Sequence, residues 1–337
     1  MNQAHNFWSV SLLSILISTS GAFFIARYGH KFSLIDNPQQ RSSHTSPTPR
    51  GGGIGIWIAF IGIGLIFTKN YQLILVPGVI GLMGFIDDRY SLSQRVRLII
   101  QIILSFLSVY SYNQPAILPV GILLVAFWVV FITATANFYN FMDGINGIAG
   151  LTGVAGFGLM AFFSYYFGHF GNEYPITLMS ISLLCACLGF LPLNFPNARV
   201  FMGDAGSLLL GFVFALFIVK LSSNIRVFLC LIMFLCTFYA DASVTIFHRW
   251  KRGENLIQPH RRHLYQYLSN ELGSPHWHVS LIYAGSQFVV GSVALFAYTK
   301  GLLWQITVFV VFSLLFLACY KFVKNMAPRF DNGKLPA

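Results

Sequence analysis

The chain has 337 residues, of which 56% are hydrophobic and 9% are charged, and its mean hydropathy is +0.68. This composition excludes a large soluble core and indicates a single all-α, polytopic integral membrane domain over residues 1–337. The formal net charge of +11 is more typical of cytoplasmic loops than of a nucleic-acid surface, so we expect a lipid bilayer and no nucleic acid as partner.

Eleven apolar runs are predicted to be transmembrane helices. In chain order they cover about 7–28, 52–68, 73–86, 98–111, 117–136, 148–168, 175–193, 207–221, 227–246, 279–299 and 302–322. Arg27, His30 and Lys31 follow the first run, and the stretch before it, MNQAHN, contains no Lys or Arg. The first run is therefore predicted to be an anchor with its N-terminus outside, not a cleaved signal peptide, and eleven spans place the C-terminus in the cytoplasm.

The charged residues support this orientation. In the predicted topology 17 of the 21 Lys and Arg residues are cytoplasmic, and the outer ones are Lys69, Lys220, Arg226 and Lys300. Of the ten acidic residues, Glu173 alone falls in an outer loop. A transporter tends to keep ionisable groups near the membrane midplane, whereas carboxylates at one interface suit a reaction between a lipid head group and a soluble substrate.

Five cytoplasmic segments, about 29–51, 87–97, 137–147, 194–206 and 247–278, carry the specific signals. The first is rich in Pro and Gly and is predicted to be an irregular connector. In the second, Asp87 and Asp88 are either solvated at the end of a span or form a magnesium site or general base. Arg97, on the next predicted helix, could face the same cavity and bind a phosphate.

The third segment places Asn137, Asn140 and Asp143 at i, i+3 and i+6, which predicts one helical face. Their oxygens could converge on a hard cation or on ribose and phosphate groups, and an interhelical hydrogen-bond ladder is the alternative.

The fourth segment offers Asn194, Phe201 and Asp204 as a hydrogen bonder, a stacking face and a metal ligand. Gly203 and Gly206 are predicted to let the backbone approach a nucleotide. The alternative is that Asp204 caps the following helix.

The fifth segment contains five basic residues and the stretch PHRRH (259–263), which suits binding of a diphosphate. The positive-inside rule by itself also explains basic residues here, and the concentration in PHRRH is what favours a binding role.

In order along the chain, IDD (86–88), NFMDGINGIAG (140–150) and VFMGDAGSL (200–208) resemble the polyprenyl-phosphate N-acetylaminosugar-1-phosphate transferase family. The family, glycosyltransferase family 4, includes the translocase that makes the first peptidoglycan lipid intermediate and initiators of O-antigen synthesis. The resemblance implies a Mg²⁺-dependent enzyme, with Mn²⁺ as a substitute, of the bacterial inner membrane. It would transfer an N-acetylaminosugar 1-phosphate from a UDP-sugar to undecaprenyl phosphate at the cytoplasmic face, release UMP and initiate O-antigen or lipopolysaccharide synthesis. A homodimer is one oligomeric state that it allows.

The resemblance also implies residue roles. Asp204 and Asn140 match the magnesium ligands, and Asp87, Asp88 and Asp143 match catalytic carboxylates, the adjacent pair either deprotonating the lipid phosphate or holding the site together. The implied substrate contacts are Arg97 to a phosphate, Asn137 to ribose or phosphate, Asn146, Asn194 and Phe201 to uridine, and Arg261, Arg262 and His263 to the sugar and diphosphate.

Two of the motifs depart from the family pattern. Asn146 stands where many relatives have Asp, and Tyr265 and Gln266 follow His263 in place of further histidines. This variant resembles the branch that starts O-antigen with N-acetylated 6-deoxyhexosamines, so we expect the chemistry to be kept and the sugar to differ. The alternatives from other classes are a transporter or flippase of an anionic lipid or lipid-linked sugar, and an inactive scaffold.

Overall fold

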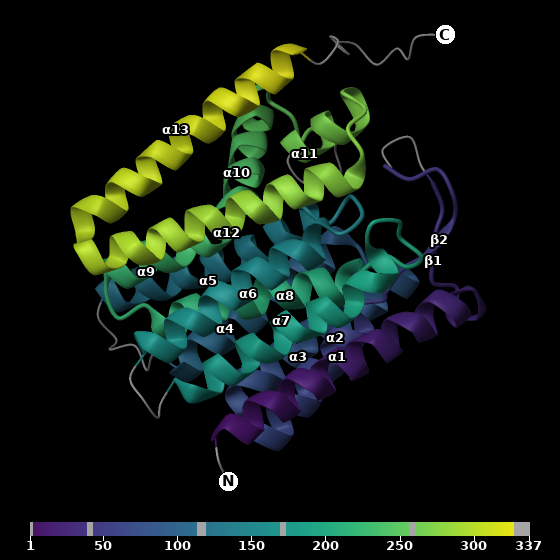
Figure 1. The fold of residues 1–337 in the computed structure, drawn as a ribbon, viewed down its shortest axis with the longest axis horizontal. Coiled ribbons are helices and arrows are strands. Elements are labelled where there is room, and N and C mark those ends of the chain that lie inside the picture. Colours follow the sequence, from purple (N-terminus) through teal and green to yellow (C-terminus); the bar gives the residue numbers. More distant parts are fainter. Residues whose placement is uncertain (1–2, 39–42, 113–118, 169–172, 256–260, 327–337) are drawn as a thin grey trace.

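The computed structural model describes residues 3–38, 43–112, 119–168, 173–255 and 261–326 (Figure 1). Over these residues the chain is an all-α polytopic membrane protein with one short antiparallel hairpin, β1 (Ile35–Asp36) and β2 (Thr48–Pro49). The helices are α1 (Gln3–Tyr28), α2 (Ile54–Ile63), α3 (Tyr71–Tyr90), α4 (Gln94–Tyr112), α5 (Pro119–Phe141), α6 (Ile148–Tyr166), α7 (Tyr174–Asn194), α8 (Gly203–Leu221), α9 (Ile225–Ile232), α10 (Cys236–Lys251), α11 (Leu264–Gln266), α12 (His276–Lys300) and α13 (Leu302–Met326).

Nine helical segments within the described ranges are long and apolar enough to cross a membrane, with α9 and α10 joined as one, Ile225–Lys251. The other two predicted spans are helical but differ from these nine. One is α2, which continues as a π-helical turn over Gly64–Thr68 and is shorter. The other is α4, which contains Arg95 and Arg97. The polytopic all-α prediction is confirmed, and the number of eleven spans stays a prediction.

The motif residues lie mostly at helix ends, where the helices extend beyond the apolar runs. α3 runs to Tyr90, α5 to Phe141 and α10 to Lys251, while α8 begins at Gly203. Helical hydrogen bonding continues for one or two turns past the apolar part of each span, because polar side chains at the interface do not interrupt it. The candidate site is therefore built on rigid elements.

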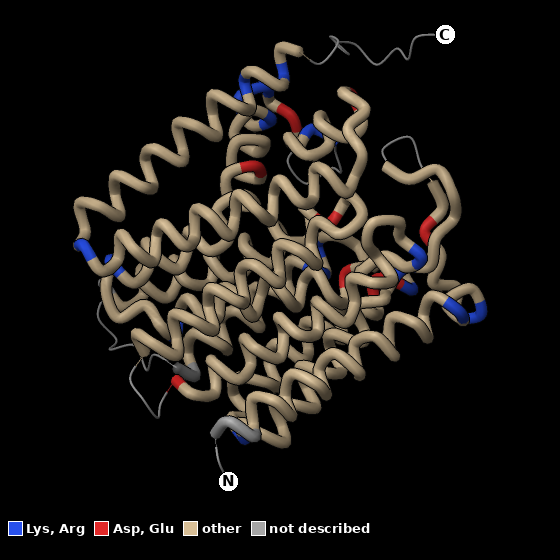
Figure 2. Tube along the Cα trace, in the orientation of Figure 1, with Lys and Arg blue, Asp and Glu red and all other residues tan. Residues whose placement is uncertain are grey.

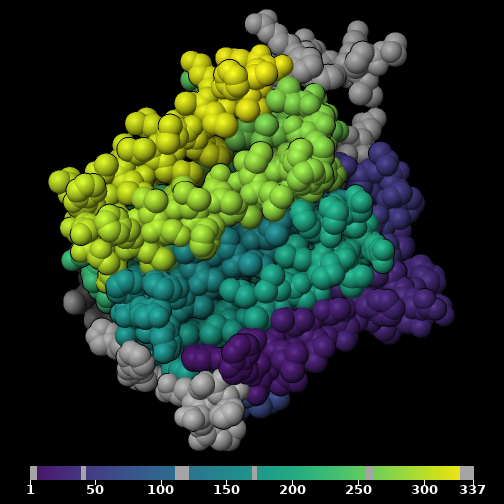
Figure 3. Space-filling model, viewed as in Figure 1, coloured from purple at the N-terminus to yellow at the C-terminus, as the bar shows by residue number. Residues whose placement is uncertain are grey.

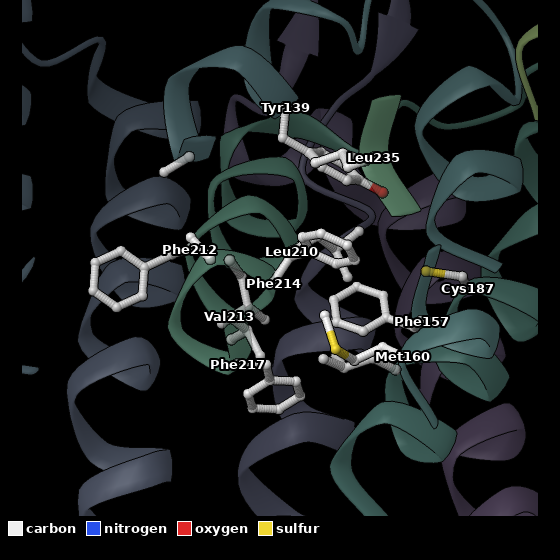
Figure 4. Close-up of a cluster of buried hydrophobic side chains, with 14 of the residues drawn as sticks. Tyr139, Phe157, Met160, Cys187, Leu210, Phe212, Val213, Phe214, Phe217 and Leu235 are labelled. Atoms are coloured by element: carbon white, nitrogen blue, oxygen red, sulfur yellow. The ribbon is translucent and has the colours of Figure 1, made fainter. Parts of the chain in front are cut away.

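The most buried of the candidate spans is α8, which packs between α3 and α5, and its Phe217 contacts Phe157 of α6 in the aromatic core (Figure 4). Small residues bring neighbouring helices close. A Cβ added to Gly189 of α7 would lie 2.5 Å from the carbonyl oxygen of Ile15 in α1. Such contacts bind helices together in a bilayer, where apolar burial gives little net driving force.

Charged residues gather toward the ends of the helices and leave the middle of the bundle apolar (Figure 2). On the face seen in Figure 3, α12 and α13 form the upper part, and earlier helices, coloured teal and purple, lie uncovered below them. Many α13 side chains, including Leu303, Leu314 and Phe322, are more than half exposed, as expected of a helix in contact with lipid.

Candidate functional site

Three helix ends meet at Arg97. Its Nη1 atom donates to Asp87 Oδ2 at 2.5 Å and to Asp204 Oδ2 at 2.6 Å, which joins the first turn of α4 to the last turn of α3 and the first turn of α8. The Arg97 side chain is 20% exposed, and its Nε atom is buried without a hydrogen-bond partner among the described residues. A buried N–H donor without an acceptor lowers the stability of the folded protein. A phosphate oxygen that accepted a hydrogen bond from this Nε would therefore be bound favourably.

Asn140 at the end of α5 completes the cluster. Its amide nitrogen donates to Asp204 Oδ1 at 2.8 Å and to Ser207 Oγ at 2.9 Å. Both oxygens of Asp204 are therefore held, one by an amide and one by a guanidinium. Ser207 was not predicted, although its position one helical turn after Asp204 could have indicated it.

Asp88 faces a different way from Asp87. Its two carboxylate oxygens accept from the backbone N–H groups of Asp204, at 2.9 Å, and Ala205, at 3.2 Å, so Asp88 caps the N-terminus of α8 from outside that helix. A Cβ on Gly203, whose φ is +72°, would lie 2.5 Å from the Asp88 carboxylate. The glycine thus leaves room for the Asp88 carboxylate, which caps this helix in place of Asp204, and the approach of a nucleotide to Gly203 stays a prediction.

We expect Asp88→Ala to lower stability by about 1–2 kcal/mol, the usual cost of losing an N-terminal cap. Asp88→Asn keeps one acceptor oxygen and should lose less. Thermal unfolding of the two purified variants in detergent gives the comparison. Equal unfolding temperatures for Asp88→Ala and the parent chain would show that the cap contributes nothing.

The convergence of Asn137, Asn140 and Asp143 on one ligand stays a prediction, and Asn137 has protein partners in this structure. The amide nitrogen of Asn137 donates to Gln101 of α4 at 2.5 Å and to the carbonyl of Thr133 at 2.8 Å. Asp143 lies beyond α5, which ends at Phe141, so a helical spacing no longer applies to it.

Burial and the charge of Asp204 raise the pKa of Asp143 to about 7. Near neutral pH its carboxyl group is therefore shared between the protonated and ionised forms, which suits proton transfer.

The residues predicted to contact uridine, Asn146, Asn194 and Phe201, lie in one region. The side chain of Asn194, however, is already hydrogen-bonded to backbone groups. It is 4% exposed, accepts from Gly147 N at 2.8 Å and donates to Val200 O at 2.9 Å. It holds the 146–147 turn against the 195–200 segment. Asn146 lies on that turn, half-buried, and donates to Pro196 O at 3.2 Å.

Phe201 is half-buried, and its ring contacts the ring of His44 at 4.8 Å between centroids. Its backbone also pairs with the first segment: Phe201 N donates to Pro49 O, and Gly52 N donates to Phe201 O. The segment that contains the β1–β2 hairpin therefore lies against Phe201, beside the residues predicted to contact uridine. The sequence did not predict this contact.

In the fifth segment, Pro259 and His260 lie outside the described residues. His263 is 2% exposed, and its Nδ1 lies 3.3 Å from Asp241 Oδ1. Arg262 forms an ion pair with Glu254, and Arg261 is half-buried. In this arrangement His263 is a buried anchor of the segment and does not face an open site.

Asp241 organises this segment and was not predicted as a site residue. It is fully buried and accepts from Leu264 N at 2.8 Å, Tyr265 N at 3.2 Å and Tyr283 Oη at 2.6 Å. Tyr265 then donates to Phe141 O at 3.0 Å, which ties α11 to the end of α5 beside Asp143.

Arg50 was also missed. Its Nε donates to the carbonyl oxygen of Asp88 at 2.8 Å. The signal for Arg50 was its position next to the glycine run Gly51–Gly53, which packs against α8 at Gly206.

Comparisons with known proteins agree with the family that these motifs resemble. The model of glycosyl transferase family 4 matches residues 71–222, the range from α3 to α8. A probable undecaprenyl-phosphate N-acetylglucosaminyl 1-phosphate transferase of Bacillus subtilis (strain 168) is 28% identical, over 91% of this chain and 87% of that protein. The decaprenyl-phosphate N-acetylglucosaminephosphotransferase of Mycobacterium tuberculosis (strain ATCC 25618 / H37Rv) is 26% identical, over 81% and 78%. An undecaprenyl-phosphate alpha-N-acetylglucosaminyl 1-phosphate transferase of Salmonella typhi is 26% identical, over 60% and 59%.

Proposed function

The chain belongs to glycosyl transferase family 4, among the polyprenyl-phosphate aminosugar-1-phosphate transferases, and from this premise we propose its reaction. It transfers an N-acetylaminosugar 1-phosphate from a UDP-sugar to undecaprenyl phosphate and releases UMP. The observation that carries the proposal is the cluster of Arg97, Asp87, Asp204 and Asn140 at the meeting of four helix ends.

The donor set of this cluster fits Mg²⁺. The described residues contain no group of three or more His, Cys, Asp and Glu side chains arranged to hold a metal. Mg²⁺ does not need one, because it commonly takes one or two carboxylates and completes its shell with water and substrate phosphates. Asp204 and Asn140 would hold the ion, with Asp87 beside them. When bound, it would neutralise the diphosphate and make UMP a better leaving group.

The chain's own residues then have distinct tasks. A phosphate oxygen of the lipid attacks the sugar-linked phosphorus, and the bond from that phosphorus to the oxygen of UMP breaks. Arg97 offers its Nε to a phosphate oxygen while Asp87 fixes the guanidinium. Asp143, with its raised pKa, is placed to hold a proton near the site. Positioning and charge stabilisation of this kind supply most of the catalysis in phosphoryl transfer.

We place this site at the cytoplasmic face of the bacterial inner membrane, with the N-terminus periplasmic and the C-terminus cytoplasmic. We propose that the reaction serves O-antigen synthesis. The distribution of basic residues supports the orientation. The clustered carboxylates lie in the last turn of α3 and the first turn of α8. A transporter would place such groups near the midpoint of broken helices, so this geometry favours an enzyme.

The test is an assay of UMP release by the purified chain with Mg²⁺, undecaprenyl phosphate and a panel of UDP-N-acetylaminosugars. We expect release that depends on both the lipid and the nucleotide sugar. The panel includes UDP-N-acetylglucosamine, because that sugar is in the names of the relatives, and UDP-linked 6-deoxy sugars, because of Tyr265 and Gln266. Their relative rates assign the donor. If none of the UDP-sugars in the panel gave UMP release, the proposed reaction would be rejected.

A further inference from the structure

The turn that joins α5 to α6, residues 142–147, carries Asp143. Within the described residues no hydrogen bond reaches the carboxylate of Asp143, while its backbone N–H donates to the carbonyl oxygen of Asn140 at 3.2 Å. The position of this carboxylate therefore depends on the backbone of the turn. The contacts that hold the turn decide where Asp143 lies.

The end of the turn is fixed by side chains from two other helices. Asn194 of α7 accepts from the backbone N–H of Gly147 at 2.8 Å. Ser280 of α12 donates to the carbonyl oxygen of Asn146 at 2.7 Å. These two bonds act after Asp143 in the chain and do not fix the residues before it.

The start of the turn is held by Tyr265. Its Oη donates to the carbonyl oxygen of Phe141 at 3.0 Å. Phe141 ends α5, and the last carbonyl groups of a helix have no partner within that helix. A Cβ added to Gly144 would overlap this Oη and lie 3.0 Å from Cζ of the same ring. The tyrosine therefore lies against the backbone on both sides of Asp143.

Tyr265 is itself held in one position. It is 1% exposed, its backbone N–H donates to Asp241 Oδ2 at 3.2 Å, and its ring packs edge-on against Tyr283, with 6.4 Å between centroids. Asp241 belongs to α10 and Tyr283 to α12, so two helices of the bundle hold this residue at α11 (Figure 1). A donor locked by its own packing and hydrogen bonds fixes its acceptor in turn.

We propose that Tyr265 is a positioning residue of the transfer reaction, whose hydroxyl group holds the turn in the conformation that places Asp143 next to Asn140. The proposal rests on the proposed function, in which Asp143 is a site residue. Because Tyr265 is buried, it acts through the turn and not by contact with a substrate. It also gives a role to one of the residues that depart from the family pattern.

The experiment starts with Tyr265→Phe, which removes the hydroxyl group and keeps the ring. The first measurement is hydrogen–deuterium exchange of the purified full chain in detergent, without substrate. We expect the peptide that contains 142–147 to exchange about fivefold faster, a factor that corresponds to the loss of one neutral hydrogen bond. Peptides from 264–271 should keep their parent rates, because the bond from the backbone of Tyr265 to Asp241 remains.

The second measurement is UMP release, with Tyr283→Phe as the matched control. Tyr283 Oη donates to Asp241 Oδ2 at 2.6 Å, so this variant loses a buried hydroxyl from the same network and no bond to the turn. Tyr265→Phe should lower kcat about fivefold with little change in the KM of either substrate. Tyr283→Phe should keep a kcat close to that of the parent and lose more thermal stability, because its acceptor is a buried carboxylate. If kcat fell in step with unfolding temperature in both variants, the role of Tyr265 would be structural and the proposal overturned.

A second pair of variants tests the contact at Gly144. Gly144→Ala puts a methyl group where the Tyr265 hydroxyl oxygen lies, so it should lower kcat. Gly144→Ala/Tyr265→Phe should recover part of this loss, because the overlapping oxygen is gone. Two independent defects would add instead, so a double variant less active than Gly144→Ala would contradict the proposal.

The exchange measurement separates this proposal from the proposed function, because it needs no substrate. Parent-like exchange over 142–147 in Tyr265→Phe, or faster exchange with a parent-like kcat, would overturn the positioning role and leave the proposed reaction in place. A parent chain that released no UMP would reject the proposed reaction, and the role of Tyr265 in it would be rejected as well.

Discussion

Asp204→Asn is expected to reduce UMP release by about 10²-fold or more while leaving the protein folded. The substitution keeps the size of the side chain and removes its charge. Asp204 Oδ2 accepts from Arg97, and an amide nitrogen at that position would face a donor. A neutral amide is also a much weaker ligand for Mg²⁺ than a carboxylate, so raising the Mg²⁺ concentration should restore little activity.

The control for this variant is Glu173→Gln, which removes a carboxylate at the start of α7, whose opposite end carries Asn194. It should retain activity. The cap of α8 belongs to Asp88, and Arg97 keeps Asp87 as a partner, so Asp204→Asn should still fold and unfold cooperatively. A folded Asp204→Asn protein that releases UMP at nearly the parent rate would reject both the metal assignment and the role of the cluster.

The helices of this fold could be predicted from the sequence because each is a long apolar run with polar ends. The residues at which these helices begin and end could not be predicted in this way. Asp87 and Asp88 were placed on a loop because hydropathy falls there, yet α3 continues to Tyr90. Hydropathy reports where a chain leaves lipid, whereas the end of a helix depends on its last hydrogen bonds and its cap.

The central part of the site was also predictable, since Arg97, Asp87, Asn140 and Asp204 lie together as their motifs indicated. The different roles of Asp87 and Asp88 were not, because neighbouring residues on a helix point about 100° apart and meet different partners. Asp88 meets the N-terminus of α8, and the close approach of α3 to α8 at Gly84 brings the two together.

The same limit applies to Asn194 and His263. Their residue types suggested ligand contacts, whereas the fold buries both and gives their polar atoms protein partners. Sequence spacing can place a polar side chain in a region, but whether the side chain remains available to a substrate depends on contacts made across the fold.

Arg97→Gln is expected to have the second large effect, because it leaves the Asp87 and Asp204 carboxylates facing each other without the cation between them. Removing one partner of a buried ion pair typically costs about 3–5 kcal/mol, and the lower end applies to this partly exposed group. Activity should fall by about 10²-fold or more. Arg97→Lys keeps the charge but loses the planar fork and the Nε donor, so it should restore stability more fully than activity.

The matched control is Arg95→Gln, two residues earlier on α4, where the side chain is exposed. A loss of stability caused by carboxylate repulsion should also be partly reversed in Arg97→Gln/Asp87→Asn, because one of the two charges is then gone, whereas its activity should stay low. Thermal unfolding and UMP release measured on the four variants separate these contributions. If Arg97→Lys were fully active, the charge alone would suffice and the buried Nε would have no part in binding phosphate.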